Sequence, residues 1–237
     1  MTSLAVPLDP REIDCVFLDV DGTIVHEDAH VLVSVCWQIA RSGGETYTAA
    51  EIGAKWSEEW FGLCEISNEE EYAPCRELLP RSLQATLDHF GIEFEMEPWI
   101  RAVIEYSRRS PVTHDAWAFL DEVGIPVCLL TNRDSGPLRE TLERGRIQAA
   151  GVITSEDVRA YKPHPAMFRA ALETMGASPE RVVHIGDSHH ADVCGAARVG
   201  LQTVWLNRAN EPAPIAEGIR ADRVVRSLLE LLPPSVA

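Results

Sequence analysis

The sequence predicts an α/β protein, built on a doubly wound parallel sheet with a separate helical domain inserted after the first strand. From about residue 112 onward, short apolar segments alternate with helical segments, the pattern of a parallel sheet whose crossovers are helices. Between about residues 26 and 111 helical patterns prevail instead. We therefore expect a Rossmann-like core of residues 1–25 and 112–237, and an inserted α-helical cap domain of residues 26–111.

The first strand is predicted over residues 13–19, where the apolar run Cys15–Leu18 leads into Asp19. A continuous apolar run is typical of a strand buried on both faces of a parallel sheet. Gly22 predicts a sharp turn soon after it. Further strands are predicted over 125–130, 151–154, 182–185 and 201–206, with a short one within 222–232. Helices are predicted over 113–123, from about 137, within 163–175, over 191–199 and at the end of the 222–232 segment.

The inserted segment is expected to hold helices over 28–41, 48–64, 68–89 and 96–109. Thr48 and Glu51 have the spacing of a capping box, and Asn68 is expected to cap the third helix. Gly91 is typical of a helix C-terminus, and Pro98 fits the first turn of a helix. An insert at this point of the chain lies above the carboxyl edge of the sheet, where it can serve as a lid.

Charge and composition exclude several classes of function. The 237 residues carry a net charge of −16, which argues against nucleic acid and anionic membranes as partners. There is no run of 18 apolar residues, and the first residues lack the features of a signal peptide, so we expect a cytoplasmic protein. We expect its six cysteines to be reduced and structural, since none forms a C-x-x-C pair. They are Cys15, Cys36, Cys64, Cys75, Cys128 and Cys194.

We expect polar residues at the ends of four strands. Asp19 and Asp21 are one residue apart, and two close carboxylates favour a divalent cation between them. Only two lysines occur in the chain, and Lys162 is one of them, which suggests a need for a compact positive charge there. The other polar positions are Thr131 with Asn132, and Asp187 with Asp192. The carboxyl ends of parallel strands form one edge, where α/β proteins place their ligands.

In this order the four motifs resemble those of the haloacid dehalogenase superfamily, and the resemblance covers about residues 13–25 and 112–208. The insert resembles that superfamily's type 1 helical cap, and the chain looks like a phosphatase member similar to phosphoglycolate phosphatases. The resemblance implies that Asp19 is the nucleophile, that Asp21 is the general acid and base, and that Lys162 binds both Asp19 and the substrate phosphate. It also implies Mg²⁺ on Asp19, Asp187 and the main-chain carbonyl of Asp21. Thr131 and the N–H groups around Asn132 would hold phosphate oxygens, and Asp192, Gly22 and Thr23 would support the site.

The function we expect from this resemblance is Mg²⁺-dependent hydrolysis of a small phosphorylated metabolite through an aspartyl phosphate, by a monomer or homodimer. True dehalogenases of the superfamily lack the second aspartate, so Asp21 favours phosphoryl chemistry. Sugar-phosphate mutases keep both aspartates and remain an alternative. Lys55, the only lysine of the insert, leaves phosphonatase chemistry open. A non-catalytic binding protein on this fold is the remaining alternative.

Two further features have more than one interpretation. His26-Glu27-Asp28-Ala29-His30 matches the H-E-x-x-H pattern of zinc proteases, but no third ligand follows at a suitable spacing. The insert also contains four of the six tryptophans, which pack a helical core or form an aromatic wall for a substrate. They are Trp37, Trp56, Trp60 and Trp99.

Overall fold

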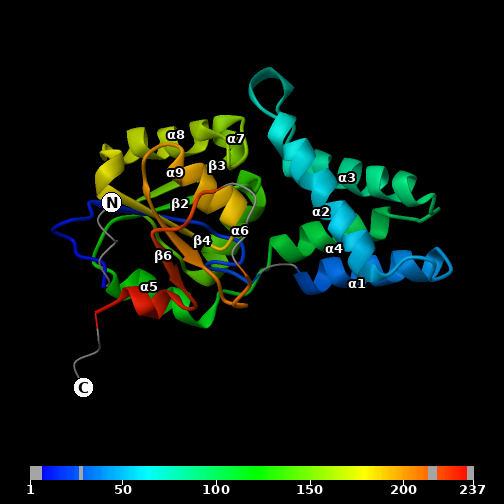
Figure 1. Cartoon of the computed structure of the whole chain (residues 1–237), viewed down its shortest axis with the longest axis horizontal. Coiled ribbons are helices and arrows are strands. Elements are labelled where there is room, and N and C mark those ends of the chain that lie inside the picture. The colour runs from blue at the N-terminus through cyan, green and yellow to red at the C-terminus, as the bar shows by residue number, and fades with distance from the viewer. Residues whose placement is uncertain (1–6, 27–28, 213–217, 234–237) are drawn as a thin grey trace.

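A computed structural model describes residues 7–26, 29–212 and 218–233 of the chain. Its centre is a parallel sheet of six strands in the order β3-β2-β1-β4-β5-β6 (Figure 1). This order confirms the doubly wound α/β fold. The strands are β1 (Cys15–Leu18), β2 (Val127–Thr131), β3 (Gly151–Thr154), β4 (Val182–Gly186), β5 (Gln202–Leu206) and β6 (Arg223–Val225).

Successive residues of β1 belong to two different apolar cores, because side chains alternate across a strand. Val16 and Leu18 pack with the helices α5 (His114–Glu122) and α6 (Ser135–Gly145) and the short helix η4 (Leu228–Leu231). Cys15 and Phe17 pack on the opposite face with α8 (Pro165–Met175) and α9 (Gly195–Ala197). The remaining short helices of the core are α7 (Ser155–Val158), η2 (Pro179–Arg181) and η3 (His189–Cys194).

The order of the strands determines where a site can form. The chain proceeds from β1 to β2 and β3 on one side, and from β4 to β5 and β6 on the other. β1 therefore lies between β2 and β4, with Leu18 level with Leu129 and Ile185. In such a sheet the change of direction leaves a crevice at the carboxyl ends of the strands. Asp19 directly follows β1 at this point.

The inserted helices form a layer of their own beside the sheet (Figure 1). They are α1 (Ala29–Ser42), α2 (Ala49–Ile66), η1 (Glu69–Glu71), α3 (Cys75–Phe90) and α4 (Glu97–Ser107), and we call them the cap. The cap has its own apolar core, in which the indole N–H of buried Trp56 donates to Ser82 at 2.9 Å. The domain limits at 25/26 and 111/112 stay a prediction.

Several local predictions for the cap are confirmed. Thr48 and Glu51 form the capping box of α2, with the Thr48 N–H donating to the Glu51 carboxylate at 2.8 Å. Gly91 ends α3 in the left-handed conformation, and Pro98 lies in the first turn of α4. The tryptophans fit neither interpretation as a group, because Trp56 is buried in the cap core while Trp37 is 59% exposed.

Other element predictions are wrong in part. The third cap helix begins at Cys75 rather than 68, and Asn68 instead precedes the short 3₁₀ helix η1 without capping it. The predicted helix over 191–199 is a π-helical turn, η3, followed by one turn of α-helix. The predicted terminal helix is the 3₁₀ turn η4. Thr113 precedes α5 but its hydroxyl donates to the carbonyl of Thr23 at 3.2 Å instead of capping the helix.

Three further features concern the cysteines, Lys55 and the character of the helices. All six cysteines are free thiols. Lys55 forms ion pairs with Glu58 and Glu59 on its own helix, at 3.1 and 2.8 Å. Over the described residues, none of the helices has the length and apolar character needed to cross a membrane.

A buried carboxylate, Asp115, ties the C-terminal part of the core to the turn after β1. It accepts hydrogen bonds from the Arg208 guanidinium at 2.8 and 2.9 Å, from the Ser227 hydroxyl at 2.7 Å and from the Leu228 N–H at 2.9 Å. Arg208 also donates to the carbonyls of Gly22 and Thr23. Burial alone would raise the pKa of Asp115, but these hydrogen bonds lower it below its usual range.

We expect Asp115→Asn to lower the free energy of unfolding by about 3 kcal/mol at pH 7, because it leaves the Arg208 guanidinium without its carboxylate partner. A carboxylate with a depressed pKa stabilises the fold above the unfolded pKa of about 3.9, and that contribution is lost as pH falls below it. The difference between wild type and variant in urea unfolding should therefore stay constant from pH 7 to about pH 5 and shrink as the pH falls below about 4. Asp121→Asn, at an exposed position of α5, is the matched control. A difference that stays constant with pH contradicts this role for Asp115.

Candidate active site

The centre of the site is a lysine between two buried carboxylates. The Lys162 ammonium donates to Asp19 Oδ1 at 2.5 Å and to Asp192 Oδ1 at 2.6 Å. Exposure is 5% for Asp19, 2% for Lys162 and 1% for Asp192, so solvent screens this cluster little. One positive charge therefore faces two negative charges, and the cluster carries an excess of negative charge.

The shifts in pKa follow from this arrangement. Burial raises the pKa of Asp19 to about 7, Lys162 opposes the rise, and the charges of Asp192 and Asp21 add to it. Burial alone would lower the pKa of Lys162, but its two carboxylate partners raise it above the usual lysine value. For Asp192, burial favours the neutral acid, but Lys162 and His184 outweigh burial and lower its pKa. The least stabilised anion of the cluster is therefore Asp19.

Asp192 is held in place by groups that leave it little freedom. Its Oδ1 also lies 2.9 Å from His184 Nε2, and its Oδ2 accepts from the Ser188 N–H at 3.0 Å. Burial lowers the pKa of His184, which favours the neutral ring, and the contact with the Asp192 carboxylate favours the tautomer with its proton on Nε2. Gly186 leaves room for the carboxylate, because a Cβ at that position would lie 2.2 Å from Asp192 Cγ. These contacts make Asp192 a support for Lys162.

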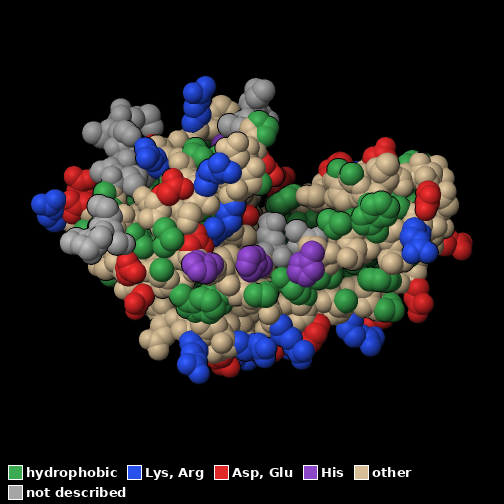
Figure 2. Space-filling model, turned by 90° about the horizontal axis from the view of Figure 1, so that it is seen from below, with side chains coloured by type: hydrophobic (Ala, Val, Ile, Leu, Met, Phe, Trp, Pro, Cys, Tyr) green, Lys and Arg blue, Asp and Glu red, His purple; other side chains and the backbone are tan. Residues whose placement is uncertain are grey.

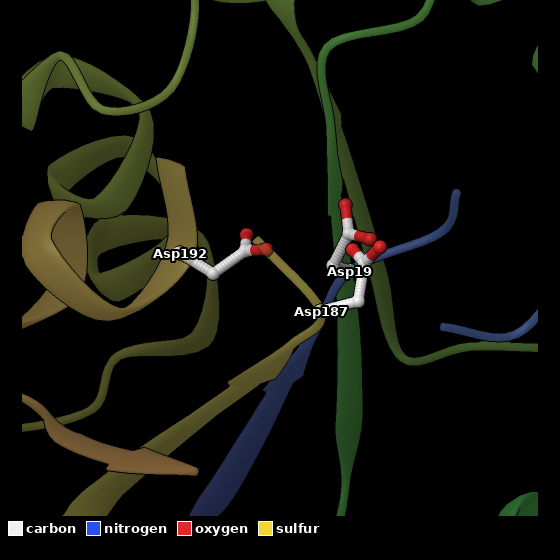
Figure 3. A group of neighbouring side chains, drawn as sticks. All are labelled: Asp19, Asp187 and Asp192. Carbon is white, nitrogen blue, oxygen red and sulfur yellow. The ribbon is translucent and has the colours of Figure 1, made fainter. Parts of the chain in front are cut away.

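Asp187 completes the acidic group. Figure 3 shows its carboxylate beside that of Asp19, while Asp192 points toward the pair from the opposite side. The three residues each offer an oxygen, and these oxygens lie within 4.8 Å of one another. Hard oxygen donors around excess negative charge fit Mg²⁺. Because Asp192 already accepts from Lys162, His184 and Ser188, the residues that fit the ion best are Asp19 and Asp187.

Asp21 faces a different partner. Its carboxylate accepts from Arg133 Nε at 2.8 and 2.9 Å and also from Arg133 Nη2, in a bidentate pair. The Asp21 side chain is 42% exposed, whereas that of Arg133 is 8% exposed. The structure thus separates the two aspartates of the first motif, with Asp19 on Lys162 and Asp21 on Arg133.

The loop after β2 is fixed to Lys162 through the main chain. The Asn132 side chain accepts from the Lys162 N–H at 2.7 Å and donates to the Lys162 carbonyl at 3.1 Å. Thr131 is fully buried, and its hydroxyl accepts from the Arg133 N–H at 3.2 Å. The predicted phosphate-binding residues and the lysine are therefore parts of one hydrogen-bonded unit. Gly22 adopts the left-handed conformation that turns the chain after Asp21.

The cap also contacts this loop. Asp134 accepts from the N–H groups of Cys75 and Arg76, at 2.8 and 3.2 Å, which are the first amides of α3. Pro74 precedes α3 and has no side chain that could accept from these amides. A carboxylate of the core therefore provides the N-terminal hydrogen-bond acceptor for a helix of the cap. The Cys75 thiol donates to the Asn132 carbonyl, and the Tyr161 hydroxyl donates to the Ala73 carbonyl, both at 2.8 Å.

A cavity of about 880 Å³ opens between the core and the start of the cap, and Asp187 lies on its wall. Its histidines are His26, His30, His189 and His190. Figure 2 shows histidine side chains in a row on the face seen from below. Glu27 and Asp28 of the H-E-x-x-H pattern lie outside the described residues. Within the described part of the chain, the group of side chains placed to hold a metal ion is Asp19, Asp187 and Asp192, without His26 or His30.

The model of the family described as haloacid dehalogenase-like hydrolase matches residues 13–200 of this chain. The chain belongs to this family. The match covers β1, the whole cap and the core through η3 and α9, and so includes every residue of the site. The expected superfamily is thereby confirmed.

Relatives of this hydrolase include both phosphatases and dehalogenases. Pyrophosphatase PpaX of Bacillus mycoides is 24% identical over 232 residues, 94% of this chain and 96% of that protein. Haloacetate dehalogenase H-2 of Moraxella sp. is 24% identical over 84% of this chain and 87% of that protein. The phosphoserine phosphatase of Thermus thermophilus is 36% identical over 115 residues, but the match spans 44% of each protein.

Several solved structures have the same fold as this hydrolase. A dehalogenase with an intermediate complex has a TM-score of 0.75 at 19% identity, over 93% of this chain and 96% of that one. The putative HAD-hydrolase YfnB of Bacillus subtilis, solved bound to magnesium, has a TM-score of 0.68 at 21% identity, over 93% and 97%. At these identities the likeness supports the Rossmann-like core and the inserted cap.

Sequence reasoning missed several residues of this hydrolase site. Arg133 and Asp134 directly follow Thr131-Asn132, yet they bind partners in the first motif and in the cap. His184 lies inside a strand, where it reads as an ordinary buried residue. Being adjacent to the motif was the available signal for Arg133 and Asp134, but nothing in the local pattern identifies their partners.

We expect Asp134→Ala to destabilise the hydrolase by about 1–2 kcal/mol, because it removes the cap of α3 and leaves two amides without their acceptor. Hydrogen exchange should speed up at the amides of Cys75 and Arg76 while the amides of the sheet stay protected. Asp121→Ala is the control, since it removes an exposed carboxylate from α5. Unchanged exchange at the start of α3 contradicts a capping role for Asp134.

Proposed function

We propose that this protein is a Mg²⁺-dependent phosphomonoester hydrolase that forms an aspartyl phosphate on Asp19. The observation that carries the proposal is the buried Asp19–Lys162–Asp192 cluster beside Asp187, with a second aspartate, Asp21, two residues after the nucleophile. The relatives include a phosphoserine phosphatase and a haloacetate dehalogenase, which act on a phosphate ester and on a halogenated acid. The second aspartate favours the first of these reactions.

In the proposed first step an Asp19 oxygen attacks phosphorus and the ester P–O bond breaks. Asp21 gives a proton to the leaving alkoxide. In the second step Asp21 takes a proton from water as the water oxygen attacks the same phosphorus, the acyl phosphate bond breaks, and the Asp19 carboxylate is restored with inorganic phosphate. General acid and base catalysis of this kind contributes about 10²–10⁴-fold.

The remaining residues would bind the phosphate group and neutralise its charge. Lys162 contacts the nucleophile and would also contact a phosphate oxygen, as a compact cation can. The Thr131 hydroxyl and the N–H groups after it would hold the other oxygens. Mg²⁺ held by Asp19, Asp187 and the Asp21 carbonyl would supply the charge neutralisation that a phosphate dianion needs next to a carboxylate. Two like charges at about 4 Å repel by about 4 kcal/mol at an effective dielectric constant of about 20.

The proposed substrate is a small phosphorylated metabolite, because Asp187 lies on the wall of a cavity of about 880 Å³ between the core and the start of the cap. A sugar-phosphate mutase would use the same two aspartates. The distinguishing result is the product, since a hydrolase releases inorganic phosphate whereas a mutase returns an isomeric phosphate ester.

The direct test is hydrolysis of p-nitrophenyl phosphate. We expect activity that requires Mg²⁺, disappears in EDTA and returns when Mg²⁺ is added. Asp19→Asn should lose more than about 10³-fold in kcat, because the nucleophile is removed. Asp121→Asn should keep wild-type activity. If wild type and Asp19→Asn are equally inert with every divalent metal tested, the proposed function is wrong.

Asp21→Asn separates phosphate hydrolysis from dehalogenation. We expect kcat for an alkyl phosphate to fall by about 10²–10⁴-fold, since the alkoxide leaving group loses its proton donor. Halide has no need of a proton, so dehalogenation of a 2-haloacid would survive this change. Phosphate release and halide release are measured on the same preparations. The protein would be a dehalogenase if wild type releases halide but no phosphate, and if Asp21→Asn still releases halide.

A further inference from the structure

Arg133 contacts more than the proposed acid and base. Besides Asp21, it donates from Nη1 to the Ser107 carbonyl at 2.7 Å and to the Thr141 hydroxyl at 3.2 Å, and from Nη2 to the Ser110 hydroxyl at 2.9 Å. Every nitrogen of the buried guanidinium therefore has a partner. The planar group joins three parts of the chain: the turn after β1, helix α6 and the segment that follows α4.

The segment after α4 is the return connection from the cap to the core. Ser107 is the last residue of α4. The outgoing connection runs beside it, because the His26 N–H donates to the Pro111 carbonyl at 2.8 Å and Val25 pairs with Val112. We call residues 24–26 and 108–112 the hinge. Both connections between the sheet and the cap pass through the hinge.

We propose that Arg133 is a positioning residue that couples the hinge of the cap to the carboxylate of Asp21. The geometry supports this role. The guanidinium binds the Asp21 carboxylate through Nε and Nη2. It also binds Ser107, at the end of α4, through Nη1, and Ser110, in the hinge, through Nη2. A displacement of Ser107 and Ser110 withdraws partners from Arg133 and so alters the placement of Asp21. The inference rests on the proposed function for the role of Asp21, and on contacts alone for the link to the hinge.

Lysine is a poor replacement for this arginine. A single ammonium has no planar fork, so it cannot bind the Asp21 carboxylate in bidentate fashion and reach Ser107 and Ser110 together. Ser110→Ala removes the hinge hydroxyl and keeps the bidentate pair with Asp21. Arg133→Lys and Ser110→Ala interrupt the coupling at different places. Both preserve most of the buried packing, so they can be used if Arg133→Ala folds poorly.

The activity arm compares two leaving groups. In Arg133→Ala and Arg133→Lys we expect kcat for an alkyl phosphate to fall by about 10²-fold with little change in KM, because Asp21 is misplaced. First-turnover release of nitrophenolate from p-nitrophenyl phosphate should change little, since that group leaves without a proton. In an Asp21→Ala background, adding Arg133→Ala should lower kcat by less than about twofold. If Arg133 had a purely structural role, its substitution would lower the rates for both substrates equally. It would also lower kcat in the Asp21→Ala background.

The hinge arm needs no activity. Trypsin cleaves after Arg108 and Arg109 in the hinge, and mass spectrometry identifies the cut. We expect cleavage there to be several-fold faster in Arg133→Ala, in Asp21→Ala and in Ser110→Ala than in wild type. Arg139→Ala, at an exposed position of α6, should match wild type.

The two arms separate the inference from the proposed function. If wild type hydrolyses no phosphate ester, the proposed function fails, and the hinge arm still decides whether Arg133 joins Asp21 to the hinge. Faster hinge cleavage in both Arg133→Ala and Asp21→Ala supports the coupling. Cleavage equal to wild type in either of them overturns it, as does an equal loss of kcat for both substrates in Arg133→Ala.

Discussion

One buried ammonium group holds the site together. Lys162 lies between Asp19 and Asp192, and the burial of two carboxylates would be unfavourable without it. Much of the surrounding structure serves to place this group. Asn132 binds the Lys162 main chain at both its N–H and its carbonyl, so the lysine backbone has one position relative to β2. Asp192 is fixed next to Lys162 by its contacts with His184 and Ser188. Gly186 leaves room for it, because any side chain there would clash with the Asp192 carboxylate.

The charge of the cluster constrains the chemistry that we propose for it. Two carboxylates share one lysine, Asp187 adds a third, and the whole chain is strongly acidic. A phosphate dianion approaches such a site only where local cations outweigh that field. Lys162 and Arg133 are the cations that the described core places beside the two aspartates of the first motif. A divalent cation would supply further positive charge, and it would stabilise the anion of Asp19, whose pKa is raised by burial.

The sequence was a good guide wherever the determining interaction is local. The apolar runs of the strands, the Thr48–Glu51 capping box and the Gly91 terminus depend on neighbours a few residues away, and they were predicted correctly. Three of the four motifs lie at the ends of β1, β2 and β4 as predicted, whereas Lys162 follows the short helix α7 and not a strand. The third cap helix was misplaced because its N-terminal amides bind Asp134, a residue of the core. Likewise, Arg133 and Asp21 are 112 positions apart, and no local pattern pairs them.

The position of Asp134 has a consequence for how caps and cores can be exchanged. Helix α3 has no acceptor of its own for its first amides and takes one from the loop after β2. A cap moved onto another core of this family would keep its apolar interior but lose that acceptor unless the recipient loop carries a carboxylate two positions after the asparagine. Recombination between family members is thus constrained by a short loop as well as by the domain boundaries. In building chimeras, the cap and the loop after β2 should be transferred as one unit.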